Sequence, residues 1–308
     1  RPRRGDGHHV WACRLPLDEG LGGAGRLMME LSAARRASYL VRQTFRYEYP
    51  EPIRDLSHRL VVIPPERFGD QRRLWHDVSV GHEGARLENG SDRFGNVVVD
   101  VFAPAVLSAI EFVAEASVER RADEPNRLPD GWLADDYLLH PSPLTEPDDA
   151  IMRAADDLSS GAAWGLPLAD RINDWVYQSM TYRHGVTGVR TTAAEALAQG
   201  SGVCQDYAHV MLAVCRACGL PARYVSGHML GQGGTHAWVE VVLPAHDGTG
   251  EAIAHAFDPT HASRGGLGYV TVAVGGDYAD VAPTSGTYRS GARGRLTATK
   301  KVSLLEAE

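Results

Sequence analysis

The sequence predicts an α+β protein in which a β-sandwich-like module precedes a second domain of helices and strands. Three observations indicate this division. From residue 38 to about residue 121, β-branched and aromatic segments alternate with turn signals such as Asn89-Gly90. Residues 122–147 carry several prolines and acidic residues, which favours a linker. After residue 148 apolar residues recur at helical spacing, and two strand-like segments follow.

Four segments of the first module are expected to be strands. Residues 39–49 alternate loosely between apolar and polar side chains and end at Pro50. The apolar runs 60–63, 97–102 and 109–119 are bounded by turns. Short strands separated by turns imply a β-sandwich or a related sheet module.

Helix-start signals mark the second domain. Thr145, three residues ahead of Asp148, predicts a helix that runs to about Leu158. The segment Thr192-Ala-Ala-Glu195 is a capping box, so it predicts a short helix that Gly200 ends.

Composition narrows the class of protein. The 308 residues are 44% hydrophobic and 23% charged, which is typical of a soluble globular chain. The net charge of −8 argues against a nucleic-acid partner, and no uninterrupted apolar stretch reaches the roughly 20 residues needed for a membrane. The four cysteines are too few for a disulfide scaffold, so we expect a cytoplasmic protein. No feature indicates an oligomeric state.

The segment Gly200-Ser-Gly-Val-Cys204 predicts a sharp turn into a helix that begins at Cys204. Apolar residues from Tyr207 to Cys218 follow at helical spacing as one stripe, and Gly219 ends the helix. A helix N-terminus favours the thiolate and lowers the thiol pKa below its ordinary value of ~8.5. Cys204 is therefore a candidate nucleophile.

A catalytic thiolate needs a base and a group that orients the base. His236 opens a predicted strand that runs to Leu243, after a glycine-rich loop. A second strand, 252–257, leads into Asp258. If the two strands are neighbours, Asp258 accepts a hydrogen bond from one ring nitrogen of His236 and leaves the other to face Cys204.

Four ordered motifs resemble the bacterial transglutaminase-like superfamily; they are Gly202–His209, Gly219–Gly227, His236–Glu240 and Phe257–Thr260. Residues 39–119 resemble the N-terminal β-module of the same proteins, and residues 278–283 resemble their tail. The resemblance implies a papain-like α+β core with a Cys-His-Asp triad on Cys204, His236 and Asp258.

Composition and patterning, together with the extent of the resemblance, predict a division of the chain. Residues 1–37 are expected to be a disordered extension, 38–121 the β-rich module, 122–147 a linker, 148–300 the catalytic domain and 301–308 a tail. We assign no function to residues 1–27.

Further residues are candidates for the pocket or its support. Tyr182, Trp238, Asp206 and Tyr207 are expected to line the substrate pocket or to support the helix start. His184 and His228 are alternatives for the pocket, with a structural role favoured for both.

Cys215 and Cys218 have the spacing of a metal or redox site, but they lie on the apolar stripe and are expected to pack in the core. Acyl transfer by a Cys-His-Asp triad requires no metal and no organic cofactor.

The expected activity is acyl transfer from protein or peptide amide bonds through a thioester on Cys204. Water as the second reactant gives a peptidase or amidase, and a lysine amine gives cross-linking; of the two we favour hydrolysis. The alternative is a non-enzymatic module that retains the fold and binds proteins or peptides.

Overall fold

The computed structural model describes residue 31 and residues 33–122 and 124–308. The disorder expected for the extension concerns mostly residues 1–30, which lie outside the described part. The end of that extension is ordered, because Leu31 is buried and the first strand begins at Arg36.

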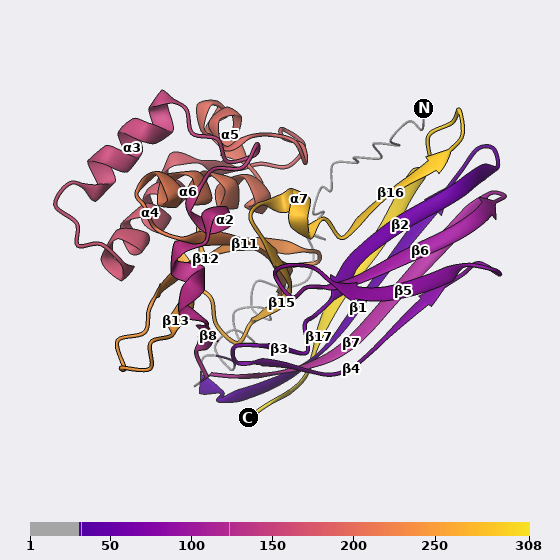
Figure 1. The fold of residues 1–308 in the computed structure, drawn as a ribbon, viewed down its shortest axis with the longest axis horizontal. Coiled ribbons are helices and arrows are strands. Elements are labelled where there is room, and N and C mark those ends of the chain that lie inside the picture. The colour runs from indigo at the N-terminus through magenta and orange to yellow at the C-terminus, as the bar shows by residue number, and fades with distance from the viewer. Residues whose placement is uncertain (1–30, 32, 123) are drawn as a thin grey trace.

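Two antiparallel sheets form the sandwich, and their long strands occupy the right of Figure 1. In the described part of the chain one sheet has the order β17-β1-β7-β4-β3 and the other β16-β2-β6-β5. Between them lies a core built around Phe45, Leu60 and Phe112. The strands are β1 (Arg36–Glu48), β2 (Ile53–Ile63), β3 (Arg67–Phe68), β4 (Gln71–Val80), β5 (Arg86–Ser91), β6 (Val97–Val106), β7 (Ala109–Arg121), β16 (Thr284–Arg289) and β17 (Arg295–Ala307).

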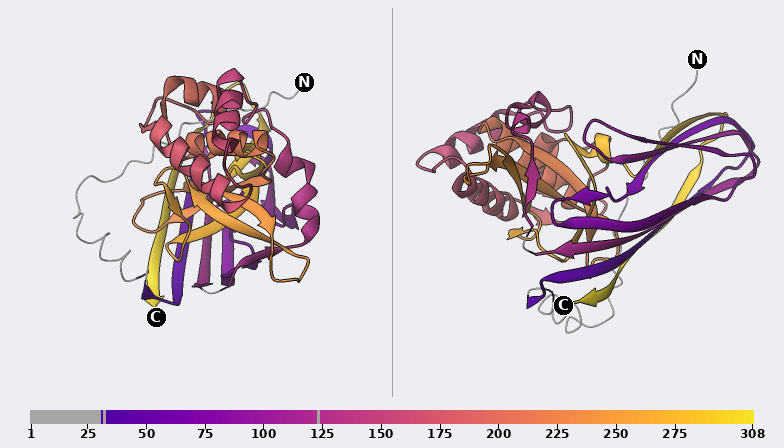
Figure 2. Two further views of the ribbon diagram at one scale, coloured as in Figure 1. Left: turned by 90° about the vertical axis from the view of Figure 1, so that its left-hand side faces the viewer. Right: turned by 60° about the horizontal axis from the view of Figure 1, so that its bottom comes forward.

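The second domain is a sheet of order β14-β13-β12-β11-β15, with β8 also on β13 and helices gathered at one side (Figures 1 and 2). Its strands are β8 (Asn126–Leu128), β11 (Ala222–Met229), β12 (His236–Pro244), β13 (Ala252–Asp258), β14 (Ser263–Arg264) and β15 (Tyr269–Gly275), beside the short pair β9 (Thr181–Tyr182) and β10 (Ser201–Gly202). Its helices are η1 (Asp130–Ala134), α2 (Asp136–Leu139), α3 (Asp149–Ser159), α4 (Leu166–Ser179), α5 (Ala193–Gln199), α6 (Cys204–Ala217) and α7 (Tyr278–Val281). The architecture is the α+β class that the sequence predicts.

Helix α6 is the centre of this domain. The sequence predicts one apolar stripe, but residues 205–216 are buried all round. The reason is that α6 packs against β11 and β12 on one side and against α3, α4 and α5 on the other. A helix covered on every side has no solvent face to keep polar.

The helix-start signals give mixed results. The capping box of Thr192 and Glu195 is present, and Gly200 ends α5 with φ of 63°. Helix α3, however, is capped by Asp148, which accepts from the backbone of Ile151. Thr145 is instead buried and accepts a hydrogen bond from Arg216, so its expected role as a helix start is wrong.

The expected linker, 122–147, is part of the second domain. Strand β8 pairs with β13 and extends the sheet. Arg127 bridges to Asp247 and Glu251 at the far end of the β12–β13 hairpin. Leu138 of α2 is fully buried. Backbone pairing and burial therefore hold this segment in place.

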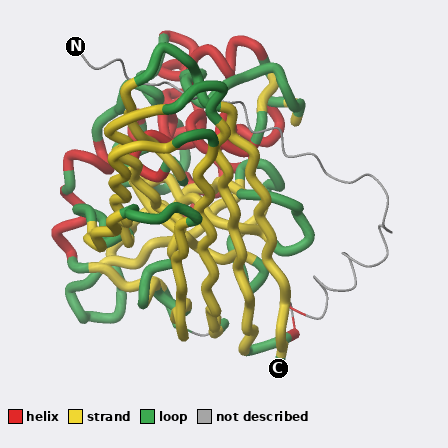
Figure 3. Tube along the Cα trace, turned by 90° about the vertical axis from the view of Figure 1, so that its right-hand side faces the viewer, coloured by secondary structure: helices red, strands yellow, loops and turns green. Residues whose placement is uncertain are grey.

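Residues 301–308, expected to be a tail, belong to the sandwich. So does the end of the expected catalytic domain. Strand β16 pairs with β2, and β17 pairs with β1 over almost its whole length. Figure 3 shows the C-terminal strand running beside the long strands of the sandwich. The physical reason is that β17 alternates, so one of its faces covers the core between the two sheets.

Two side-chain amides join the sandwich to the second domain. Strand β15 is an edge strand, so its outer N–H and C=O groups need partners. Gln71 donates to the carbonyl of Thr271 and accepts from its N–H, both at 2.8 Å. Asn96 does the same with Val274, at 2.7 and 2.8 Å. Each side-chain amide therefore makes the two hydrogen bonds that the backbone of a neighbouring strand would otherwise make.

Among the helices in the described residues, none is both long and apolar enough to cross a membrane.

The packing of β17 gives a testable prediction. Val302 contacts the core that includes Tyr39 and Val41, whereas its neighbour Lys301 is exposed. Changing Val302→Asp places an unpaired charge against that core and is expected to lower the free energy of unfolding by about 2–4 kcal/mol. Lys301→Asp is the matched control, with an expected change within about 0.5 kcal/mol. Equal effects in chemical denaturation would contradict the packing of β17.

Candidate active site

Tight local geometry fixes the start of α6. The side chain of Asp206 accepts from the N–H of Val203 and from the hydroxyl of Thr187, both at 2.7 Å. A Cβ on Gly202 would lie 2.5 Å from Asp206 Oδ2, so only glycine fits there. Burial raises the pKa of Asp206, although these hydrogen bonds oppose the shift. Cys204 is the first residue of the helix, as the sequence predicts.

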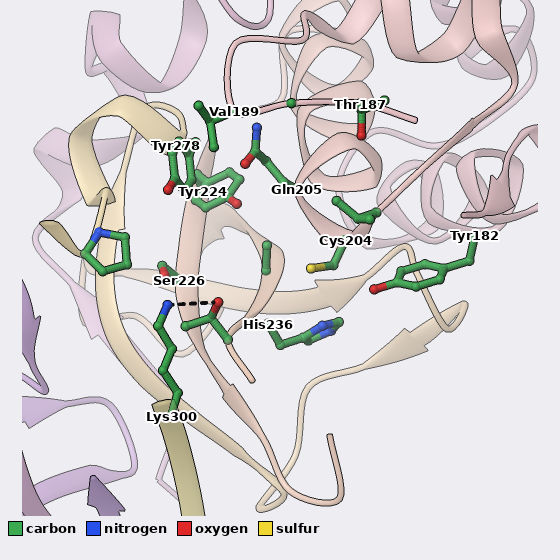
Figure 4. Close-up of a pocket in the computed structure, with 15 residues that line it drawn as sticks. Tyr182, Thr187, Val189, Cys204, Gln205, Tyr224, Ser226, His236, Tyr278 and Lys300 are labelled. Carbon is green, nitrogen blue, oxygen red and sulfur yellow. Dashed lines mark hydrogen bonds between the residues drawn. The ribbon is translucent and has the colours of Figure 1, made fainter. Parts of the chain in front are cut away.

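Cys204 opens into a cavity with about 680 Å³ of empty space that is open to solvent. Figure 4 shows Cys204 and His236 facing this cavity, with Tyr182 at one end and Lys300 at the other. The lining comes from α6, from the strands β11 and β12, from the loop before α5 and from β17. The lining residues are Tyr182, Thr187, Gly188, Val189, Val203, Cys204, Gln205, Tyr224, Ser226, Thr235, His236, Ala237, Tyr278, Pro283 and Lys300.

His236 and Asp258 are brought together by the β12–β13 hairpin. The two strands are antiparallel, with Val239 opposite Phe257. His236 Nε2 lies 2.7 Å from Asp258 Oδ2, and both side chains are buried. His236 Nδ1 has no hydrogen-bond partner among the described residues.

Asp258 is completely buried, and its carboxylate is saturated with donors. Besides His236, Oδ2 accepts from His261 Nδ1 and from the hydroxyl of Tyr269, each at 2.8 Å, and Oδ1 accepts from the N–H of Thr260 at 2.9 Å. Burial alone would raise the pKa of Asp258, but the hydrogen bonds and charges of His236 and His261 hold it well below its ordinary value. The group is therefore a carboxylate at neutral pH.

Three of these side chains are also of the types that bind metal ions. His236, Asp258 and His261 are the one group of potential metal ligands found in the described residues, with ligand atoms within 4.8 Å of one another. Both histidine nitrogens point at one carboxylate oxygen, at 2.7 and 2.8 Å. These are hydrogen-bond lengths between donors and an acceptor, and they account for the contacts without an ion.

The other expected site residues divide into lining and support. Tyr182 lines the cavity. Trp238 is buried and stacks on His236, with ring centroids 6.2 Å apart, and it is not among the residues that line the cavity. Asp206 supports the helix start. Tyr207, on α6, is buried in the core of the second domain with its ring 6.2 Å from that of Tyr182, and it is not among the residues that line the cavity.

The residues for which a structural role was favoured do not line the cavity. His184 packs edge-on against the ring of Tyr182 at 5.1 Å. His228 is buried and bonded to the carbonyl of Gly234. Cys215 is buried, and Cys218 donates to the carbonyl of Ala155. Burial raises the pKa of Cys218 to about 11, which fits a packed thiol.

Four residues at the site were missed by the sequence reasoning. His261 and Tyr269 bind Asp258, and Gln205 and Lys300 line the cavity. His261 follows Asp258 by three residues in a tight turn, which is a spacing that could have signalled contact. Lys300 interrupts the inward face of β17, and this too is visible in the alternation once the strand is known.

Comparison with known proteins assigns the family. The model of the transglutaminase-like superfamily matches residues 153–250, and the model of the bacterial transglutaminase-like N-terminal region matches residues 39–119. The chain belongs to the transglutaminase-like superfamily. Cys204 and His236 lie within the matched core, and Asp258 lies just beyond it.

One relative matches most of this chain, and another matches about a third of it. An uncharacterized protein of Mycobacterium tuberculosis is 29% identical, over 84% of this chain and 90% of its own length. One of Mycobacterium leprae is 39% identical, over 37% of this chain and 42% of its own length. A solved structure of a candidate cysteine protease from Cytophaga hutchinsonii has a TM-score of 0.70 at 21% identity, covering 89% of this chain and 93% of that one. This likeness shows a common fold.

The bond between His261 and Asp258 predicts a pH-dependent stability. That bond and the negative charge of Asp258 raise the pKa of His261, while partial burial opposes the shift. A raised folded-state pKa stabilises the fold below the unfolded value of about 6.5, and the contribution is lost as pH rises through the folded-state value.

We therefore expect His261→Gln to lose most stability relative to wild type below about pH 6, and progressively less at higher pH. Denaturant unfolding between pH 5 and pH 9 measures the difference. His246→Gln, at an exposed loop position, is the control and should differ from wild type by the same small amount throughout. A difference for His261→Gln that does not vary with pH would contradict the linkage.

Proposed function

We propose that this protein is a cysteine acyl-transfer enzyme that acts on protein or peptide amide bonds through a thioester on Cys204, with His236 as base and Asp258 as the orienting acid. The observation that carries the proposal is the state of His236. Its Nε2 is held at 2.7 Å by a buried carboxylate, while the ring lines the same cavity as Cys204.

The tautomer of His236 follows from its partner. The low pKa of Asp258 keeps the carboxylate ionised, so it can only accept a hydrogen bond. Nε2 must therefore carry the proton. In the neutral ring Nδ1 then bears the lone pair, and Nδ1 has no other hydrogen bond among the described residues. An imidazole held this way is ready to accept the proton of a thiol.

The reaction proceeds in two halves. His236 Nδ1 takes the thiol proton, and Cys204 Sγ attacks the carbonyl carbon, whose π electrons move to oxygen. When the tetrahedral intermediate collapses, the C–N bond breaks and His236 gives its proton to the departing nitrogen. In the second half His236 takes a proton from water or an amine, which attacks the thioester; the C–S bond breaks and the proton returns to sulfur.

Two groups are suited to bind the developing oxyanion or the substrate amide. The N–H of Cys204 is at the first position of α6, where backbone donors are not used by the helix itself. Gln205 lines the cavity, and its Nε2 is buried with no hydrogen-bond partner among the described residues. Trp238, stacked on His236, limits the access of water to the imidazole.

The cavity opens to solvent, and this favours water over an amine as the second reactant. We therefore place hydrolysis ahead of cross-linking. The name of the Cytophaga hutchinsonii structure, a candidate cysteine protease, agrees with this order. We also propose a cytoplasmic location, which keeps the thiol reduced.

A first test of the proposed function concerns the reactivity of Cys204. Wild-type protein should react rapidly with iodoacetamide below pH 7, because the helix N-terminus and His236 favour the thiolate, and Cys204→Ala should lose this labelling. Peptide mass spectrometry identifies the labelled cysteine, with Cys218 as the internal reference. Slow labelling, equal in both proteins, would contradict the proposed enzymatic function and favour a binding module with the same fold.

A second test of the proposed function changes His236 and Asp258. His236→Ala and Asp258→Asn should each lower turnover of glutamine-containing peptides by about 10²- to 10⁴-fold. Assays with and without a primary amine show whether cleavage or amine incorporation completes the reaction. Thermal unfolding checks that both variants fold. A folded Asp258→Asn variant with wild-type turnover would remove Asp258 from the mechanism.

A further inference from the structure

Four uncharged polar side chains gather on one side of Cys204 in the candidate active-site cavity. They are Gln205 on α6, Tyr224 and Ser226 on β11, and Tyr278 on α7. Tyr224 and Ser226 alternate along the strand, so both project from the same face of β11. The rings of Tyr224 and Tyr278 have centroids 6.4 Å apart. Figure 4 shows this group of four, the polar subsite, on the side of Cys204 away from Tyr182.

The polar groups of this subsite have no hydrogen-bond partner in the described part of the chain. Gln205, Tyr224 and Ser226 are buried, with exposed fractions of 9%, 2% and 7%. Nε2 of Gln205 is hidden from solvent and forms no hydrogen bond with a described residue. The hydroxyls of Tyr224, Ser226 and Tyr278 form none either with residue 31 or with residues 33–122 and 124–308. Because an unpaired buried polar group costs free energy, these groups favour a ligand that supplies their partners.

The surroundings of the polar subsite disfavour a negative charge. Burial raises the pKa of Tyr224 well above its ordinary value, and nearby charges, among them those of Cys204, Asp206 and Asp277, raise it further. Burial likewise raises the pKa of Tyr278 to about 12, so both tyrosines keep their protons at neutral pH. The same burial and the same negative charges would act on a carboxylate placed beside Tyr224. A neutral ligand therefore fits this side of the cavity.

A carboxamide has the hydrogen-bonding groups that this subsite lacks. Its carbonyl oxygen can accept from Nε2 of Gln205, and its NH2 group can donate to the hydroxyls of Tyr224 and Ser226. A carboxylate has no donor and brings a charge, whereas an aliphatic side chain would leave Gln205 Nε2 unpaired. The neutral group with both a strong acceptor and two donors is thus the better match.

The proposed chemistry indicates which part of a substrate reaches the polar subsite. His236 gives its proton to the departing nitrogen, so the leaving side of the substrate lies toward His236. Figure 4 shows His236 and Gln205 on opposite sides of the Cys204 sulfur. The acyl side of the substrate, which stays on Cys204 in the thioester, therefore extends toward Gln205.

We propose that the polar subsite binds the carboxamide side chain of an asparagine or glutamine residue whose backbone carbonyl is attacked by Cys204. The inference rests on the proposed function and deepens it by naming the substrate class, a peptide bond that follows a carboxamide residue. Gln205, Tyr224 and Ser226 then determine specificity, and the N–H of Cys204 remains the donor for the oxyanion.

The test uses three capped tripeptides, acetyl-glycyl-X-glycinamide, in which X is asparagine, leucine or aspartate. The three side chains have nearly the same shape and differ in chemistry, and the aspartate peptide is included because Lys300 also lines the cavity. Protection of Cys204 from iodoacetamide gives the affinity of wild-type protein for each peptide. The asparagine peptide should bind about tenfold more tightly than either of the others.

Two variants assign this preference to the polar subsite. Tyr224→Phe removes one hydroxyl and keeps the ring, so the asparagine-to-leucine affinity ratio should fall about three- to tenfold. Gln205→Leu replaces the unpaired amide by an apolar group of similar size, and the preference should turn toward leucine. Tyr177→Phe, at an exposed position of α4 outside the cavity lining, is the matched control and should keep the ratio. Thermal unfolding checks that each variant folds.

The outcomes separate this inference from the function on which it rests. Rapid labelling of wild-type Cys204 with equal protection by the asparagine and leucine peptides, or with protection by none of the three, would overturn the subsite and leave the proposed enzymatic function intact. Stronger protection by the aspartate peptide would also overturn it, because the cavity would then select an anion. Slow labelling of wild type, no faster than that of Cys218, would contradict both proposals. The comparison of peptides on wild type needs no variant, so it decides the question even where a substitution prevents folding.

Discussion

The buried carboxylate of Asp258 is the constraint around which the candidate site is arranged. A fully buried charge is costly unless its lone pairs are satisfied. Here four donors meet that need, from His236, His261, Tyr269 and the backbone of Thr260. These donors come from β12, from the turn after β13 and from β15, so the carboxylate fixes the positions of three elements at once.

This arrangement links the candidate chemistry to sheet register. His236 pairs with Gly227 of β11, and Val239 pairs with Phe257 of β13. A slip of one residue would move His236 to the other face of the sheet, away from both Asp258 and the cavity. A Cβ on Gly227 would lie 2.1 Å from the carbonyl of Val270 and 2.6 Å from the ring of Trp238, so this position also allows only glycine. The register of β12 therefore determines the position of the His236 imidazole.

The sandwich is structurally inseparable from the site that it adjoins. Gln71 and Asn96 complete the edge of β15, the strand that supplies Tyr269 to Asp258. The hydroxyl of Tyr39 in β1 donates to the carbonyl of Leu267, just before β15. The chain then returns after α7 to add β16 and β17, and β17 lines the cavity. A module that appears in the sequence as an appendage is thus part of the wall of the site.

The sequence by itself determined the features that depend on near neighbours in the chain. The α+β class, four strands of the first module (β1, β2, β6 and β7), the helix that begins at Cys204 and the capping box before α5 follow from alternation, helical spacing and turn chemistry. The turn expected at Asn89-Gly90 is wrong, because both residues pair with β6 as part of β5. These signals act over a few residues, so they can be read without the fold. The motifs also singled out Cys204, His236 and Asp258 for a shared role.

Only the tertiary structure decided what depends on distant pairing. The segments at 126–128 and 295–307 carry weak local signals. They are strands because they pair with the backbones of β13 and β1. Tyr269 and Lys300 reach the site from strands separated from Cys204 by 65 and 96 residues of sequence, as their numbers give. No local pattern encodes such contacts, because a long-range contact is favoured only once packing has placed both partners.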